Sequence, residues 1–334
     1  MSRLFESFVS INLLTAGLGL AFGIALLWYG SNLVTQKIAP IAKHFGVKEL
    51  VITILGVSVL SSLPELTVSL FAAAAGKADI SLGNVIGSNF VTLTFVTALC
   101  ALISPIVVRT EIKERESSWM ILSTTAIFLL AIDGRLSRLD GVILMLLYLP
   151  YLAAVVREAV QEAKTKQNEL STKDPRILLH FIAGIAGIFA VILGAKTALV
   201  SGESIGKILG LAPAVLGILI FAFGTSLPEL AIALSATLRK KADISIGEVY
   251  SSNIFTALFI LGACAVVMPM TLFENPAVPS VLVKYDIPFL ILAGVIIQIF
   301  VTTGSILKRG EALIILLLYV YFVVIHFVPG LLPF

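Results

Sequence analysis

Long apolar runs without a charged residue constrain this sequence more than any other feature. Seven runs contain no Asp, Glu, Lys or Arg: 7–36, 80–108, 177–195, 208–228, 249–273, 287–307 and 312–334. Most reach the roughly 20 residues that an α-helix needs to cross the hydrocarbon core of a bilayer. Only 13% of the 334 residues are charged, against about 25% in average globular proteins. We therefore expect an integral membrane protein, and we exclude a soluble enzyme, a nucleic-acid binder and a secreted disulfide scaffold.

The first run and the two cysteines have simple interpretations. Residues 7–36 form a charge-free stretch far longer than the roughly 7–15-residue apolar region of a signal peptide, so we expect this segment to stay in the membrane. Cys100 and Cys264 lie deep in apolar runs. We expect both to act as small hydrophobic side chains.

Apolar runs bounded by charge, Gly or Pro predict an all-α integral membrane protein with ten transmembrane helices. The predicted spans are 10–36, 49–75, 80–107, 117–133, 140–156, 177–202, 208–238, 243–272, 286–307 and 311–332. Between the fifth and sixth spans, residues 157–176 carry nine charged residues and are expected to form an aqueous linker. This linker divides the chain into a first five-helix half, residues 1–156, and a second half, residues 177–334.

The two halves repeat each other at a constant offset of 164 residues. Residues 58–92 superimpose on 222–256 without a gap, and 17 of the 35 pairs are identical. The matches include SSLPEL with TSLPEL and KADIS with KADIS. An odd number of spans in each half makes the second half enter the bilayer from the opposite side, so we predict inverted repeats.

The basic residues predict an orientation. If alternate loops are assigned to opposite sides, the side with the linker holds sixteen of the 23 Lys and Arg, and the side with the N-terminus holds seven. The positive-inside rule then places the linker in the cytoplasm and both termini outside. The expected location is the cell membrane, with multiple passes.

Each repeat places a carboxylate near the middle of a span, directly after a proline. The two motifs are Leu63-Pro64-Glu65 and Leu227-Pro228-Glu229. Carboxylates inside a membrane are costly and face a partner or a water-filled cavity. Because proline lacks an N–H, carbonyls of the preceding turn are expected to lose helical partners and to become available as ligands.

Other oxygen-bearing residues share helical spacing with these acids. In the first half they are Ser58, Ser61 and Ser62, then Asn84, Ser88 and Thr92; in the second half they are Ala222, Thr225 and Ser226, then Glu248, Ser252 and Thr256. Each triplet lies on one face of a helix. Carboxylate, carbonyl and hydroxyl oxygens suit a hard cation such as Ca²⁺, whereas imidazole and thiolate suit zinc or copper. The pattern predicts a hard-cation site.

Simpler interpretations stay open at several positions. Any one Ser or Thr can serve only helix packing or bond its own backbone, and Asp79 and Asp243 are expected to be helix caps. Glu248 is either a third acid of the site or a residue near the positive end of a helix dipole. A channel is an alternative to a transporter, while a membrane hydrolase using Ser62 or Ser226 lacks a histidine near those serines.

At these motifs the sequence resembles the cation/Ca²⁺ exchanger superfamily, most closely its prokaryotic sodium/calcium exchanger branch. The resemblance rests on GVSVLSSLPEL…ADISLGNVIGSN and AFGTSLPEL…ADISIGEVYSSN. It implies a mid-membrane ion site and export of Ca²⁺ by alternating access, with the first and sixth spans rocking against the rest. It also implies that Glu65 and Glu229 are the central carboxylates, assisted by Ser61 and Thr225. The flanking sodium sites would use Ser62, Ser88, Ser226 and Ser252 with backbone oxygens of Ser58 and Ala222.

Five positions depart from the family pattern and bear on the expected coupling ion. Leu60 replaces a glycine in the first repeat, and Thr92 and Thr256 stand where such exchangers usually carry Asn or Asp. In the second repeat Glu248 replaces the asparagine of the GN motif, and Ser251 replaces the glycine that follows in that motif. We expect an antiporter, not an enzyme, that exports Ca²⁺ in exchange for Na⁺, with H⁺/Ca²⁺ exchange as the alternative. The expected partners are these transported ions and the lipid bilayer, with no cofactor and no nucleic acid.

Overall fold

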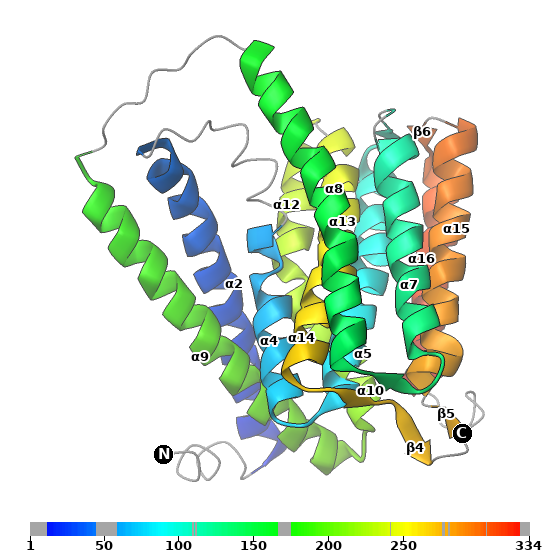
Figure 1. Cartoon of the computed structure of the whole chain (residues 1–334). Coiled ribbons are helices and arrows are strands. Elements are labelled where there is room, and N and C mark those ends of the chain that lie inside the picture. Colours follow the sequence, from blue (N-terminus) through cyan, green and yellow to red (C-terminus); the bar gives the residue numbers. More distant parts are fainter. Residues whose placement is uncertain are drawn as a thin grey trace.

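The computed structural model describes residues 12–44, 59–108, 110, 112–165, 175–240, 242–275, 278–279, 281–304 and 306–327. This part of the chain is almost entirely helical, with strands of two or three residues at helix ends (Figure 1). Several helices contain π-helical segments, labelled η, in which the backbone is locally wider than an α-helix.

Seven helices of the described residues are long and apolar enough to cross a membrane. They cover Leu13–Ile38, Ala78–Ile103, Arg138–Glu158, Ile177–Leu209, Ser245–Val267, Leu282–Gly304 and Arg309–Phe327. An eighth span is possible if Pro213–Thr225 and Leu227–Leu238, which are bent by 44° relative to each other, form one broken helix. The prediction of a helical protein with many spans is thus confirmed, and the count of ten stays a prediction.

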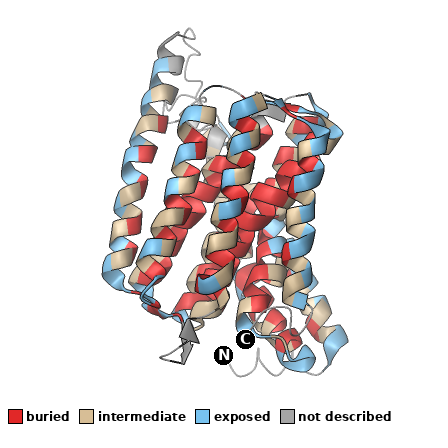
Figure 2. Cartoon of the chain, turned by 90° about the vertical axis from the view of Figure 1, so that its right-hand side faces the viewer, coloured by how far each residue is buried: buried red, intermediate tan, exposed pale blue. Residues whose placement is uncertain are grey.

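The centre of the molecule is built from two sets of helices whose bounds repeat at the 164-residue offset. The first set is α4 (Leu63–Ala74), α5 (Ala78–Phe90), η1 (Val91–Val96) and α6 (Thr97–Ile103). The second set is α12 (Leu227–Leu238), α13 (Ala242–Ile254), η4 (Phe255–Ile260) and α14 (Leu261–Val267). Figure 2 shows buried residues concentrated in the middle of the bundle. The repeated sequence therefore folds into matching elements at the core of the protein.

Two long helices, α2 (Leu13–His44) and α9 (Ile177–Leu209), lie side by side at one edge of the bundle (Figure 1). Glycines allow their backbones to touch: a Cβ at Gly30 would lie 2.7 Å from the Gly187 carbonyl oxygen, and a Cβ at Gly23 would lie 2.9 Å from that of Gly194. Such small residues permit close helix contact where lipid supplies no hydrophobic driving force. The α2–α9 pair is closely packed at both of these glycine contacts.

The remaining helices flank the centre on the other side. They are η2 (Ile112–Glu116) with α7 (Ser117–Ala131), α8 (Arg138–Thr165), η5 (Leu282–Asp286) with α15 (Ile287–Gly304), and α16 (Arg309–Phe327). Three short elements, α10 (Pro213–Val215), η3 (Leu216–Phe221) and α11 (Ala222–Thr225), lead into the broken helix before α12. α8 continues into the charged segment as far as Thr165, and residues 166–174 lie outside the described part.

Short antiparallel strands join the ends of helices from the two halves. β1 (Ile106–Val107) pairs with β6 (Ile306–Leu307), and β2 (Arg135–Leu136) pairs with β3 (Met270–Thr271). In the first pair Ile106 faces Leu307. A local hairpin is formed by β4 (Phe273–Asn275) and β5 (Val278–Pro279). These pairings connect the two halves at the helix ends, and their buried residues Ile106, Leu136, Met270 and Leu307 belong to the apolar core.

Candidate functional site

A break in each repeated helix positions the candidate carboxylates. The helix preceding α4 ends at Ser62, and the helix preceding α12 ends at Ser226; both serines have backbone angles outside the helical range, with ψ of 13° and 6°. Pro64 and Pro228 follow in the first turn of the next helix, where a missing N–H costs no hydrogen bond. The repeated Ser-Leu-Pro-Glu sequence therefore begins a new helix in the middle of each repeat.

Glu65 and Glu229 lie in the first turns of α4 and α12, and each is only 1% exposed. A helix N-terminus favours a carboxylate because of its partial positive charge. In each carboxylate the Oε2 atom is buried and makes no hydrogen bond within the described part of the chain. No ion pair to either acid is found among the described residues. Both side chains therefore carry an unused acceptor atom into the protein interior.

Each acid is bonded by a serine of the opposite repeat. Ser62 Oγ donates to Glu229 Oε1 at 3.0 Å, and Ser226 Oγ donates to Glu65 Oε1 at 3.2 Å. The helical spacing predicted that each serine shares a face with the acid of its own repeat. The break at the serine instead directs its hydroxyl across to the other repeat, so that the two halves interlock.

A second pair of contacts surrounds the first. Ser61 Oγ donates to Glu248 Oε1 at 2.8 Å, and Thr225 Oγ1 donates to Asn84 Oδ1 at 3.2 Å. These contacts are equivalent under the 164-residue offset. All four residues are buried, with Glu248 6% exposed and Asn84 fully buried. The structure therefore brings Ser61, Thr225, Asn84 and Glu248 close to the serine–carboxylate pairs.

Two asparagines that the sequence analysis did not single out join α5 to α13. Asn89 Nδ2 donates to the Asn253 carbonyl at 3.2 Å, and Asn253 Nδ2 donates to the Asn89 carbonyl at 3.4 Å. Thr92 Oγ1 lies 2.6 Å from Asn253 Oδ1. The repeated Ser-Asn of the GSN and SSN motifs was the available sequence signal. Ser69 was also missed, although its hydroxyl accepts a bond of 2.9 Å from Asn84 Nδ2.

The remaining predicted hydroxyls have local bonds. Ser88 Oγ donates to the Val85 carbonyl, and Ser252 Oγ donates to that of Val249. Both serines are buried, as is Thr256, which lies in η4 one turn beyond Ser252. These bonds agree with the packing interpretation and do not join the serines to the acids. Ser58 lies outside the described residues.

Two carbonyls ahead of the prolines have hydrogen-bond partners. The Leu60 carbonyl, whose helical partner would be the missing N–H of Pro64, accepts a bond of 2.8 Å from Ser31 Oγ in α2. In the second repeat the Ala222 carbonyl, six residues before Pro228, accepts the Ser226 N–H at 3.1 Å. Ala222 therefore keeps its helical hydrogen bond, because the helix continues up to Ser226.

The potential cation ligands at this site are oxygen atoms, and the carboxylates among them give the site a negative charge. Carboxylates, hydroxyls and an amide form the contacts described above, a set suited to hard cations. The described residues contain no group of three His, Cys, Asp or Glu close enough to hold one metal ion. The arrangement is better described as two adjoining sets of ligands, one around each central carboxylate.

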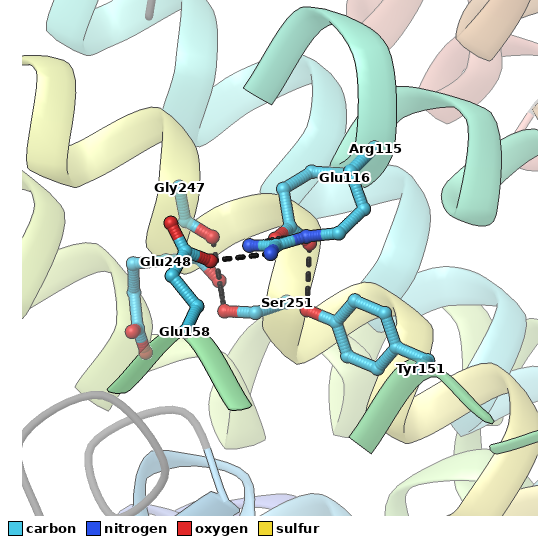
Figure 3. A network of polar contacts seen from close by, with 7 residues as sticks. All are labelled: Arg115, Glu116, Tyr151, Glu158, Gly247, Glu248 and Ser251. Carbon is cyan, nitrogen blue, oxygen red and sulfur yellow. Dashed lines mark hydrogen bonds and ion pairs between the residues drawn. The ribbon is translucent and has the colours of Figure 1, made fainter. Parts of the chain in front are cut away.

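A separate polar cluster lies against the other side of α13 (Figure 3). Arg115 forms ion pairs with Glu116 and Glu158, and Tyr151 donates its hydroxyl to Glu116 Oε2 at 2.6 Å. Burial opposes the charge on Arg115, but its hydrogen bond to Glu158 and the charge of Glu116 raise the pKa of Arg115 above its usual value. Figure 3 shows the Glu248 carboxylate pointing away from this cluster. Arg115 therefore stays charged and is engaged by acids other than those of the site.

Comparisons with known proteins identify the family. Residues 15–157 and 179–328 match the model of the family described as "Sodium/calcium exchanger protein". The chain is 30% identical over 298 residues to the uncharacterized membrane protein MJ0091 of Methanocaldococcus jannaschii, covering 89% of this chain and 93% of that protein. It is 28% identical over 357 residues to the sodium/calcium exchanger MaX1 of Methanosarcina acetivorans, covering 96% and 99%.

Solved structures agree with this assignment. The sodium-calcium exchanger NCX_Mj, in crystals soaked with Na⁺ and Sr²⁺, superimposes with a TM-score of 0.64 and 27% identity, covering 94% of this chain and 99% of that one. The resemblance predicted from the repeated motifs is thereby confirmed. The chain belongs to the sodium/calcium exchanger protein family.

Proposed function

We propose that this protein is a secondary active antiporter that exports Ca²⁺ in exchange for Na⁺. One observation carries the proposal: Glu65 and Glu229 are buried at helix breaks, each with one oxygen bonded by a serine of the opposite repeat and the other oxygen unused. Two desolvated carboxylates with free acceptor atoms favour binding of a cation. The named relatives MaX1 and NCX_Mj, both sodium/calcium exchangers, support the same cargo.

The proposed architecture is ten spans in two inverted halves, residues 1–156 and 177–334, joined by the linker 157–176 in the cytoplasm. The identical offsets between α4 and α12 and between α5 and α13 support two equivalent halves. The reciprocal bonds of Ser62 with Glu229 and Ser226 with Glu65 are those expected of a two-fold relation. The proposed location is the cell membrane.

In the proposed mechanism the site binds Ca²⁺ and the counter-ions in turn. Glu65 and Glu229 supply the charge, and Ser62, Ser226 and the Ala222 carbonyl supply neutral oxygens. The further proposed ligands are Ser61, Thr225, Ser88, Ser252, Ser58, Thr92, Thr256, Asn84 and Glu248. The closely packed α2–α9 pair moves as one body against the central helices and alternates access to the site.

Proton coupling is the second candidate for the counter-ion. Thr92 and Thr256 stand where the family resemblance leads one to expect a carboxamide or carboxylate, and Thr92 is engaged by Asn253. A site with fewer strong ligands for Na⁺ favours protonation of the same carboxylates as the coupling step. The relative CaxA of Alkalimonas amylolytica, a putative antiporter, is 29% identical over 266 residues.

The test is ⁴⁵Ca²⁺ uptake by the full-length protein in sealed proteoliposomes. One set of vesicles carries an outward Na⁺ gradient at equal pH, and the other carries a pH gradient without Na⁺. We expect accumulation of Ca²⁺ driven by the Na⁺ gradient, and none in vesicles containing the variant Glu65→Gln with Glu229→Gln. Uptake driven only by the pH gradient would replace Na⁺ by H⁺, and Ca²⁺ conductance without a counter-ion would indicate a channel.

A further inference from the structure

A hydrogen bond ties α2 to the helix break of the first repeat. Ser31 Oγ in α2 donates to the Leu60 carbonyl at 2.8 Å, and Ser31 is only 1% exposed. Because Pro64 has no N–H, this carbonyl lacks its usual helical partner, and the Ser31 hydroxyl takes that place. The next residue along the chain is Ser61, which belongs to the candidate site. α2 is therefore bonded to the backbone directly beside a proposed ligand.

A second polar contact joins α9 to the same repeat. Glu203 in α9 forms an ion pair with Lys77, which lies between α4 and α5. α9 also packs against α4. Each helix of the α2–α9 pair thus has its own polar contact with the first repeat, one beside the helix break and one at the connection between α4 and α5.

The second repeat lacks the groups for either contact. At the 164-residue offset, Ser31 corresponds to Ala195 and Glu203 corresponds to Ala39. An alanine side chain has no hydroxyl to donate to a carbonyl and no carboxylate to pair with a lysine, although the lysine of the KADIS motif occurs in both repeats. The two halves are therefore unequal in how they can hold the α2–α9 pair.

At the equivalent helix break of the second repeat, α2 makes an apolar contact instead. Gly224 corresponds to Leu60, and a Cβ at Gly224 would lie 2.7 Å from Ile24 Cδ1 in α2. This contact contains no side-chain donor that a shift of α2 would separate from its acceptor. Moving Ser31 away from Leu60 does separate a donor from its acceptor, and an unmade hydrogen bond is costly. The first repeat therefore resists a shift of α2 more than this contact does.

We propose that Ser31 and Glu203 are positioning residues that favour one of the two access states of the exchanger. This role rests on the proposed alternating access between inverted halves. Since the halves are related by a two-fold axis in the membrane plane, rotating one access state about that axis gives the state open to the opposite side. Each contact with the first repeat is then replaced by its equivalent in the second, where alanine cannot make it. Two polar contacts thus stabilise one state only and set the populations of both.

The apparent affinities for Ca²⁺ on the two sides of the membrane test this bias. The assay is exchange of external ⁴⁵Ca²⁺ for unlabelled Ca²⁺ inside everted and right-side-out vesicles that contain the full-length protein, so the identity of the counter-ion does not matter. A shift between the access states changes the ratio of the two KM values. A loss of folded protein lowers only the maximal rate. Vesicles with the variant Glu65→Gln with Glu229→Gln give the background.

Ser31→Ala copies the alanine of the second repeat, and we expect it to change the KM ratio by about fivefold or more. Glu203→Lys should change the ratio in the same direction by about threefold or more, because it removes a contact from the same state. Reversing the pair with Lys77→Glu and Glu203→Lys should return the ratio to within about twofold of the unaltered protein. The matched control is Thr35→Val, which removes a hydroxyl bonded to the Ser31 carbonyl of its own helix and should leave the ratio unchanged.

Three results would overturn the proposed bias: an unchanged ratio in Ser31→Ala, shifts of opposite direction in Ser31→Ala and Glu203→Lys, or no recovery in the reversed pair. If Ser31→Ala fails to fold, as judged by its melting temperature and gel filtration, Glu203→Lys and the reversed pair decide the question. Absence of saturable ⁴⁵Ca²⁺ exchange by the unaltered protein would instead contradict the proposed function.

Discussion

Glu65 and Glu229 lie in surroundings that disfavour a charged side chain. Each is buried in the interior of an apolar bundle without a cationic partner among the described residues, and each keeps one free carboxylate oxygen. Such an arrangement is unfavourable for stability alone, because the desolvation of the charge is not repaid by an ion pair. The residues are best explained by a cargo that supplies the missing positive charge.

Neutralising either central acid should abolish exchange. Two unit charges about 4 Å apart interact by about 4 kcal/mol at an effective dielectric constant of about 20, and a divalent ion doubles this value. We expect Glu65→Gln and Glu229→Gln each to reduce ⁴⁵Ca²⁺ exchange by about 100-fold or more while the melting temperature is maintained or raised. Ser88→Ala is the matched control, because the Ser88 hydroxyl bonds its own helix, and it should leave weaker but measurable exchange. Exchange at the unaltered rate in both glutamine variants would refute the site.

At the scale of elements, the 164-residue repeat made much of the fold predictable. The predicted spans 80–107 and 177–202 correspond to α5 with α6 and to α9, because the length and composition of an apolar run are local properties. The Pro64 and Pro228 motifs likewise indicated broken helices. The bonds between Ser62 and Glu229 and between Asn89 and Asn253 were not predictable, since they join residues more than 160 positions apart. No local pattern encodes which half a hydroxyl faces once its helix is broken.

Close packing between α2 and α9 leads to a prediction about that pair. A Cβ at Gly30 would lie 2.7 Å from the Gly187 carbonyl oxygen and 2.8 Å from the Val191 backbone nitrogen, so a side chain must push the helices apart. We expect Gly30→Val to lower the free energy of unfolding by about 1–3 kcal/mol and to slow exchange. Gly17→Val in the same helix is the control, because no atom lies within 4 Å of a Cβ at Gly17. Equal melting temperatures and equal fluxes of the two variants would show that the contact does not matter.

A buried histidine–aspartate contact joins η5 to α16 away from the candidate site. His326 Nε2 lies 3.1 Å from Asp286 Oδ1, and both side chains are 1% exposed. Removing one partner leaves the other buried without compensation, so His326→Ala should lower the free energy of unfolding by about 3–5 kcal/mol. Asp286→Leu combined with His326→Phe should restore stability to within about 1 kcal/mol, since an apolar pair needs no partner. Thermal unfolding in detergent distinguishes the single variant from the double variant. A double variant as unstable as His326→Ala would contradict an ion-pair role.

At the scale of the whole molecule, the charge distribution connects the fold to the direction of transport. An exporter must present its site to the cytoplasm for loading and to the outside for release, so the orientation determines which gradient does work. In the proposed ten-span topology, sixteen of the 23 basic residues lie on the side of the linker 157–176. In the proposed inverted arrangement the two halves contribute equivalent positions to the site, and one of these positions is Asn84 in the first half and Glu248 in the second.

The orientation can be tested by labelling a cysteine in the linker. The native Cys100 and Cys264 are free and no more than 1% exposed, so an impermeant maleimide should react with neither, and the unaltered protein serves as the background control. We expect Ser171→Cys to react only in inverted membrane vesicles or permeabilised cells, because positive-inside bias places the linker in the cytoplasm. A cysteine at Arg135, between α7 and α8 on the opposite side, should react in intact cells. Labelling of Ser171→Cys in intact cells would reverse the assignment.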